Sequence, residues 1–241
     1  DLTNKDYGFI GDAVGVGQLG LATGIAIAGD GRIFVTDVGQ DRVFVYSQDH
    51  KFLAAVGSEG EFISPSSVAI DNENGIFYIV DTRNHVVKVY DLRTYRYVRS
   101  IGSRGQGEDG KFNFPTNAVV DSKGNVYIVD TGNFQVQVFD SQGNFVRKFG
   151  QLGDNPGSFA RPKGIGIDSD DNIYIVDTAF QNVQIFNKDG QLLLFFGIGG
   201  SGPGRFTLPA GLTVDSQDRV LVVDQLPASV HIFQYLKPGG N

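Results

Sequence analysis

Short apolar runs separated by turn residues extend along nearly the whole chain. Residues 121–150, DSKGNVYIVDTGNFQVQVFDSQGNFVRKFG, show the pattern: a continuous apolar run, an alternating run, and a last run that ends at Gly150. Runs of four to six residues bounded by Gly, Asn and Asp are typical of β-strands, and helical periodicity is weak. With a further strand expected at 117–121, this stretch predicts a unit of four strands.

The unit recurs five times. Its second strand closes with an Asp, and an aromatic residue stands nine positions after each Asp. The closing residues are Asp37, Asp81, Asp130, Asp177 and Asp224, and the aromatic residues are Tyr46, Tyr90, Phe139, Phe186 and Phe233. Repetition with a period of this length is typical of propeller blades. We therefore predict an all-β chain, residues 1–241 forming a single β-propeller domain of five four-stranded blades at 24–57, 67–102, 117–150, 164–197 and 211–234.

The two ends of the chain complement each other in this prediction. Residues 7–11, YGFIG, follow a polar lead at 1–6 and match the last strand of the other blades, whereas the fifth blade stops at 234 after its third strand. We expect the N-terminal strand to pair with the C-terminal blade, which closes the ring and removes an open edge. The same strand inserted into another copy would give a domain-swapped oligomer, so self-association through it stays open.

A Gly-rich linker with Phe, two residues and Pro precedes each of the last four blades. Together with the repeat VYIVDTGNFQVQVFDSQGNFVRKFG, these linkers resemble the NHL repeat, and its name-giving triplet is closest at Asn84-His85-Val86. The resemblance implies a β-propeller. NHL domains usually have six blades, so the alternative is that these five form part of a six-bladed ring. Members of the family include protein-binding scaffolds, RNA-binding domains and a peptide-amidating lyase, so the resemblance implies no single function.

Composition narrows the choice of partners and compartment. A net charge of −7 makes nucleic acid an unfavourable partner, because phosphate binding depends on Lys and Arg. The absence of Cys excludes disulfides and thiolate metal sites. A chain without Met that begins at Asp1 favours a secreted or periplasmic location, although an excised domain gives the same pattern. No apolar run approaches the roughly 18 residues of a membrane helix, so no membrane span is expected.

The carboxylates offer candidate chemistry but favour turns. Each repeated Asp precedes a turn such as DTGN, where Asp accepts hydrogen bonds from backbone amides, so we predict a structural role for all five. Residues 168–172, DSDDN, are rich in oxygen ligands that calcium prefers. The corresponding turns of sister blades read DSKGN and DSQDR, so we interpret this segment as an ordinary turn.

The three His residues do not form a recognisable catalytic set. We expect His50 and His85 in turns and His231 in an outer strand, too dispersed to bind one metal ion. No Ser-His-Asp or Cys-His arrangement is visible either. The sequence therefore predicts no catalytic residue, no metal site and no cofactor, hence no enzyme, with a metal-dependent lyase as the alternative.

The loops that differ between blades carry the predicted binding site. Turns after the second strands and the linkers before the first strands contribute Arg83, His85, Phe134, Phe180, Leu226, Arg104, Arg161 and Lys163. Apolar tips beside Arg are typical of protein-binding surfaces, but Phe134 and Phe180 could instead fold back onto their own blades. We predict a non-catalytic, extracytoplasmic scaffold that binds a protein or peptide. The alternatives are a lyase- or hydrolase-type small-molecule site in the central channel, and single-stranded RNA binding by the loop tips.

Overall fold

The fold of the described residues is all-β. A computed structural model describes residues 15, 17–226 and 228–234 of the chain. Every element in these ranges is a strand apart from two single-turn 3-10 helices. The chain divides into two compact units, Asp1–Ile101 and Gly102–Asn241, which are described separately below.

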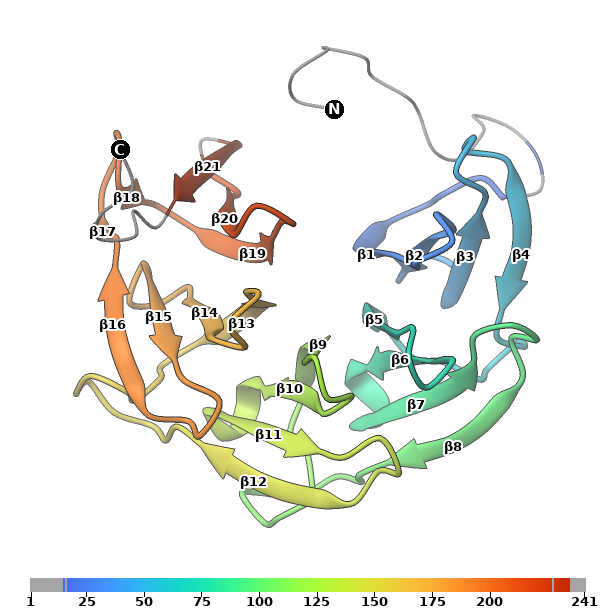
Figure 1. Ribbon diagram of the computed structural model, residues 1–241, viewed down its shortest axis with the longest axis horizontal. Coiled ribbons are helices and arrows are strands. Elements are labelled where there is room, and N and C mark those ends of the chain that lie inside the picture. Colours follow the sequence, from blue (N-terminus) through green and yellow to red (C-terminus); the bar gives the residue numbers. More distant parts are fainter. Residues whose placement is uncertain (1–14, 16, 227, 235–241) are drawn as a thin grey trace. The chain divides into compact units, whose positions relative to one another are not determined.

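The first unit holds two four-stranded antiparallel sheets in which the strands follow one another in chain order (Figure 1). The 3-10 helix η1 (Thr82–Asn84) joins the second strand of its second sheet to the third. The strands of the first sheet are β1 (Ala22–Ile27), β2 (Ile33–Asp37), β3 (Arg42–Tyr46) and β4 (Phe52–Val56), and those of the second are β5 (Pro65–Asp71), β6 (Ile76–Asp81), β7 (Val86–Asp91) and β8 (Tyr97–Ile101).

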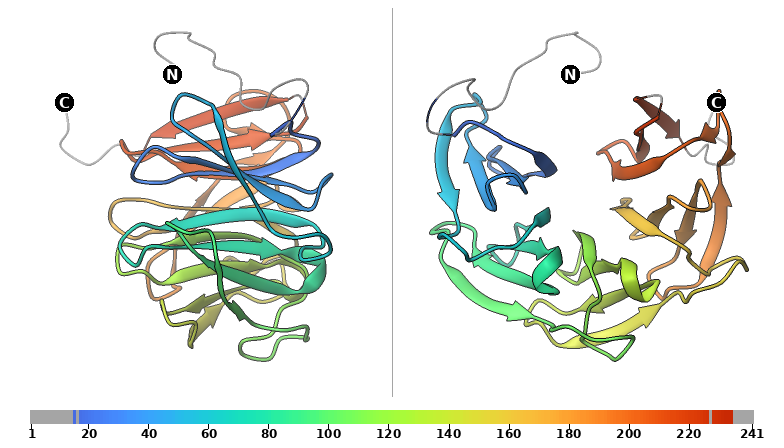
Figure 2. Two further views of the ribbon diagram at one scale, coloured as in Figure 1. Left: turned by 90° about the vertical axis from the view of Figure 1, so that its right-hand side faces the viewer. Right: turned by 180° about the vertical axis from the view of Figure 1, so that it is seen from behind.

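The second unit holds three further sheets built in the same way, and Figure 2 shows them from two other sides. They contain β9 (Pro115–Val120), β10 (Val126–Asp130), η2 (Thr131–Asn133), β11 (Gln135–Phe139) and β12 (Phe145–Phe149); β13 (Pro162–Ile167), β14 (Ile173–Asp177), β15 (Asn182–Phe186) and β16 (Leu192–Phe196); and β19 (Pro209–Val214), β20 (Arg219–Asp224) and β21 (Ser229–Gln234). The short parallel pair β17 (Ile198–Gly199) and β18 (Arg205–Phe206) lies in a linker.

The propeller prediction is confirmed, with one shift at the blade boundaries. The first strands of the last four blades begin two residues earlier than expected, at the linker Pro. This happens because the Pro pairs with the closing Asp across a bulge, as Pro162 does with Asp177. The fifth sheet has three strands among the described residues. The strand expected to complete it, 7–11, lies outside those residues, as does the lead at 1–6.

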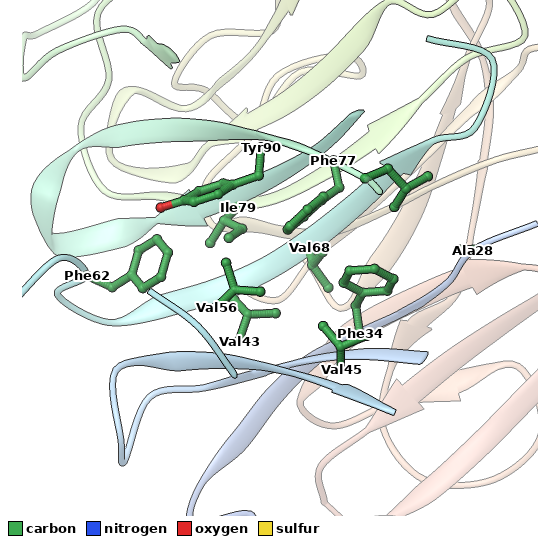
Figure 3. Packing of buried hydrophobic residues seen from close by; sticks show 11 residues of the cluster. Ala28, Phe34, Val43, Val45, Val56, Phe62, Val68, Phe77, Ile79 and Tyr90 are labelled. Carbon is green, nitrogen blue, oxygen red and sulfur yellow. The ribbon is translucent and has the colours of Figure 1, made fainter. Parts of the chain in front are cut away.

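The core of the first unit lies between its two sheets. Figure 3 shows Phe34, Val43 and Val45 of one sheet pointing toward Phe77 and Ile79 of the other. All five are 0% exposed. Burying one such side chain contributes about 1.5–3 kcal/mol. In the second unit, β14 is buried along its whole length because its sheet lies between two others.

A Gly–Phe contact explains the recurring glycine at the end of the fourth strands. Gly150 has φ 87°, and a Cβ there would lie 2.4 Å from Cε2 of the buried Phe159 in the next linker. The same close approach joins Gly57 to Phe62, Gly102 to Phe112 and Gly197 to Phe206. The linker Phe therefore seals the end of one blade, and only a residue without a side chain fits beneath its ring.

Replacing Gly150 tests this contact. We expect Gly150→Ala to lower the free energy of unfolding by about 2–4 kcal/mol, because the left-handed backbone and the overpacked Phe159 ring both cost energy. Gly157 is the matched control, since it has φ 86° but its nearest atom to an added Cβ is 3.9 Å away. Gly157→Ala should cost only about 1 kcal/mol. Urea unfolding measures both, and equal losses would contradict the Phe contact.

Candidate functional site

Hydroxyl groups link the starts of the first strands in the second unit. Thr116 Oγ1 lies 2.7 Å from Thr131 Oγ1 and 3.5 Å from the Lys163 carbonyl oxygen. Thr131 Oγ1 donates to the Pro162 carbonyl over 2.7 Å. These bonds hold the start of β13 against the end of β10, and they fix the backbone on both sides of the Pro162–Lys163 peptide bond.

Lys163 departs from this pattern by placing a charge at the position. The position after the linker Pro is a hydroxyl residue in the second and third blades, Ser66 and Thr116, whereas the fourth blade has Lys163 and the fifth has Ala210. Its side chain is half-buried at the start of β13. Burial and the nearby charge of Arg161 both lower the pKa of the Lys163 ammonium group. Among the described residues, no carboxylate lies within ion-pair distance of Lys163 or Arg161.

Asp177 fixes the segments on either side of this cation pair. The carboxylate is 0% exposed and accepts hydrogen bonds from the backbone N–H groups of Ala160, Arg161, Ala179 and Phe180, at 2.7–3.1 Å. One buried group therefore positions the linker that carries Arg161 and the turn that carries Phe180. The next residue, Thr178, donates its hydroxyl to the Pro209 carbonyl over 2.7 Å, which ties the same turn to β19.

This arrangement can bind an anion and accept a proton. A half-buried lysine beside a second, exposed cation favours a negatively charged ligand when no counter-ion is present, because the ligand would offset the charge of the buried ammonium group. Lowering the pKa of an amine increases the fraction that is unprotonated near neutral pH. A perturbed pKa of this kind marks a candidate catalytic group.

The structure brings together only some of the residues in the predicted binding site. Arg161, Lys163 and Phe180 meet around the end of β14. Phe134 is half-buried and packs against the core of its unit, as the alternative expected. Phe180 is also half-buried. Arg104 is exposed, and Leu226 is 57% exposed.

The remaining two residues of that predicted surface lie in the first unit. Arg83 is exposed in η1, whereas His85 is 6% exposed and so is not presented at the surface. His85 ends the 3-10 turn with φ 55°, in the left-handed region. Phe134 has φ 56° at the same position of the third blade and is half-buried, so this backbone angle alone does not set the burial. The expected surface position of His85 is wrong.

The closing Asp residues differ in their surroundings. Asp37 is buried, but four backbone N–H groups, those of Gly20, Leu21, Gly39 and Gln40, outweigh burial and lower its pKa. Burial raises the pKa of Asp130, to which only one backbone N–H donates, with the amides of three side chains. Burial also raises the pKa of Asp81. All five are buried at the ends of their strands, and their structural role stays a prediction.

The hydroxyl links are the part of the site that the sequence reasoning missed. A Thr follows the closing Asp in three blades, as Thr82, Thr131 and Thr178. This recurring residue was the available signal. Within residues 15, 17–226 and 228–234, no three His, Asp or Glu side chains gather as metal ligands. None of the helices in those ranges has the length and apolarity to cross a membrane.

The sheets and their linkers define this chain as a β-propeller. A family model described as a 6-bladed beta-propeller (DUF5128) matches residues 22–103, 115–181 and 168–235. The chain belongs to this family. Its six blades agree with the alternative that the five sheets found here are part of a six-bladed ring.

Sequence relatives confirm the NHL resemblance. Over 94 residues the chain is 34% identical to protein brain tumor of Drosophila melanogaster, covering 38% of this chain and 9% of that protein. It is 30% identical over 92 residues to NHL repeat-containing protein 2 of Gallus gallus, covering 33% of this chain and 12% of that protein. It is 29% identical over 123 residues to the probable peptidyl-alpha-hydroxyglycine alpha-amidating lyase pgal-1 of Caenorhabditis elegans, covering 48% of this chain and 35% of that protein. The chain thus spans a small part of each relative.

Solved structures share the fold at low sequence identity. Virginiamycin B lyase from Staphylococcus aureus aligns with a TM-score of 0.62 at 11% identity, over 90% of this chain and 71% of that one. A gluconolactonase from Xanthomonas campestris aligns with a TM-score of 0.63 at 16% identity, over 89% of this chain and 76% of that one.

These comparisons correct the expectation that the chain is not an enzyme. One sequence relative is named as a lyase, and chains of the same fold include a lyase and a gluconolactonase. The exclusion considered carboxylates and His, Cys and Ser constellations as catalytic groups. It did not consider a half-buried Lys whose amine could serve as a base.

Proposed function

We propose that this chain is an enzyme of the lyase or hydrolase type that acts on an anionic small molecule at the Lys163 site. The observation that carries the proposal is a cation pair, the half-buried Lys163 with the exposed Arg161, that no described carboxylate neutralises. The enzymatic relatives in sequence and in fold support the same class.

Lys163 and Arg161 would have different roles in this reaction. The unprotonated amine of Lys163 accepts a proton, either from the carbon next to a carbonyl in an elimination or from the water that attacks an ester or lactone. The guanidinium group of Arg161 binds the anionic group of the substrate. Burial and the charge of Arg161 lower the pKa of Lys163, which favours its unprotonated form.

Turnover assays test the proposal. The purified chain is incubated with a peptidyl-α-hydroxyglycine, which carries an anionic carboxylate, and with gluconolactone and quinupristin, which carry no anionic group and serve as controls. We expect turnover of the peptidyl-α-hydroxyglycine, or of a related anion, above the rate in buffer. Folded protein that converts none of them, and whose Lys163 amine titrates at the ordinary value of a lysine, would contradict the proposal.

A further inference from the structure

A second candidate site becomes visible when the residues at one position between neighbouring sheets are compared in successive blades. The third and fourth blades meet at Tyr127 of β10, whose ring lies 5.6 Å from the guanidinium carbon of Arg147 in β12. Arg147 Nη2 donates to the Tyr127 hydroxyl over 2.8 Å and also to the Lys188 carbonyl. A guanidinium group thus fills the space between these two sheets.

The first unit fills the corresponding place with a guanidinium group from a different residue. Phe34 holds the position of Tyr127, and the guanidinium carbon of Arg32 lies 5.6 Å from its ring. Arg32 Nη1 donates to the Leu92 carbonyl over 2.8 Å. Leu92 and Lys188 both stand two residues after the repeated aromatic residue. Two different sequence positions thus bring a guanidinium group to the same location between neighbouring sheets. We infer that this location favours a guanidinium group.

The fourth blade keeps the aromatic ring that contacts the guanidinium group, but it has neither of the two arginines. Tyr174 of β14 takes the position of Tyr127 and donates to Asp168 over 3.0 Å. Leu194 stands where Arg147 does, since the two pair with Ile185 and Val138 at the same register. The residue that corresponds to Arg32 is Asn172.

A cavity of about 540 Å3 lies at this place between the fourth and fifth sheets. Tyr174 and Asp168 line it, Ile185, Leu193 and Leu194 form an apolar wall, and Asp170 and Gln217 stand at its border. The side-chain charge beside this location is also opposite to that in the preceding blade, because Asp170 takes the position that Lys123 holds there. Asp170 is exposed, and its carboxylate makes no hydrogen bond or ion pair with the described residues.

We propose that this cavity binds the arginine side chain of a peptide ligand. The Tyr174 ring and hydroxyl receive the guanidinium group as Tyr127 receives Arg147, and Asp170 supplies the opposite charge. The apolar wall packs against the methylene groups of the side chain. A lysine side chain fits less well, because it lacks the flat guanidinium group that stacks on a ring.

Binding of Nα-acetyl-arginine amide tests the site, followed by the ring resonances of isotope-labelled tyrosines and by calorimetry at constant ionic strength. We expect saturable binding with one site, and binding at least about tenfold weaker for the citrulline analogue, which has the same shape without the charge. The lysine analogue should fall between them. Equal binding of the arginine and citrulline analogues, or no saturable change, would overturn the proposal.

Variants locate the binding in this cavity. Leu194→Arg restores the residue that the third blade carries, so the protein's own guanidinium should fill the cavity and reduce binding at least about tenfold. Val146→Arg is the matched control, since Val146 is 46% exposed and directly precedes Arg147 in β12; it should bind as the parent does. Asp170→Asn, at an exposed position, should weaken binding several-fold without loss of folding. Unchanged binding in both Leu194→Arg and Asp170→Asn would place the ligand elsewhere.

Discussion

Replacing Lys163 with Met should lower kcat/KM by about 10²–10⁴-fold on whichever substrate the chain converts, because general-base catalysis contributes about this much. Met keeps the length of the side chain and removes the amine. Lys163 is half-buried and at the edge of the sheet, so folding should be retained. The measurement is steady-state turnover together with the thermal midpoint of each variant.

The pH profile separates a base from a residue that only positions the substrate. In the parent chain kcat/KM should rise with pH as the Lys163 amine loses its proton, and the midpoint should lie below the ordinary value for lysine because burial and Arg161 lower this pKa. Arg161→Gln removes one of those causes, so the midpoint should move to higher pH while KM increases. Lys163→Arg keeps the charge and should remain inactive. A profile unchanged by Arg161→Gln, or full activity in Lys163→Met, would remove Lys163 from the reaction.

The fold could be predicted from the repeated residues of this chain because the same pattern recurs in every copy of the repeat. The closing Asp and the aromatic residue nine positions later recur in all five copies, and the linker Phe recurs in four, so the sequence gives several observations of one arrangement. The Gly150–Phe159 approach is an example: both residues recur, and their contact recurs with them. The strand boundaries shifted by two residues because the pairing of Pro162 with Asp177 crosses a bulge that periodicity alone does not show.

The candidate site could be predicted only in part because it depends on departures from the repeat. Arg161 and Lys163 were predicted as linker residues of the binding surface, but the partial burial of Lys163 and the effect of the Arg161 charge on its pKa are properties of the folded segment. His85 was expected at the surface because it lies in a turn after a second strand, where the blades differ, and its 6% exposure is a property of the folded chain. The cavity at Tyr174 requires the register of two outer strands, which shows that Leu194 replaces Arg147.

Asp177→Ala should cost about 3–5 kcal/mol of unfolding free energy, because four buried backbone N–H groups lose their acceptor together. These donors belong to Ala160, Arg161, Ala179 and Phe180. Asp177→Asn keeps one acceptor oxygen and should lose about half as much. Urea unfolding measures both variants. Asp189→Ala, which removes an exposed carboxylate without a hydrogen-bond partner among the described residues, is the control and should stay within about 0.5 kcal/mol of the parent.

The same variants distinguish a structural Asp from a catalytic one. If Asp177 only holds the Arg161 linker in place, Asp177→Asn lowers stability while the pH midpoint of the remaining turnover stays at the value set by Lys163. A catalytic Asp177 would behave in the opposite way: Asp177→Asn would abolish turnover with little loss of stability. Because Asp37, Asp81, Asp130 and Asp224 close their strands at the same position, a similar stability loss on replacing each of them would place Asp177 in the shared framework, whereas a loss of turnover confined to Asp177 would assign it to the site.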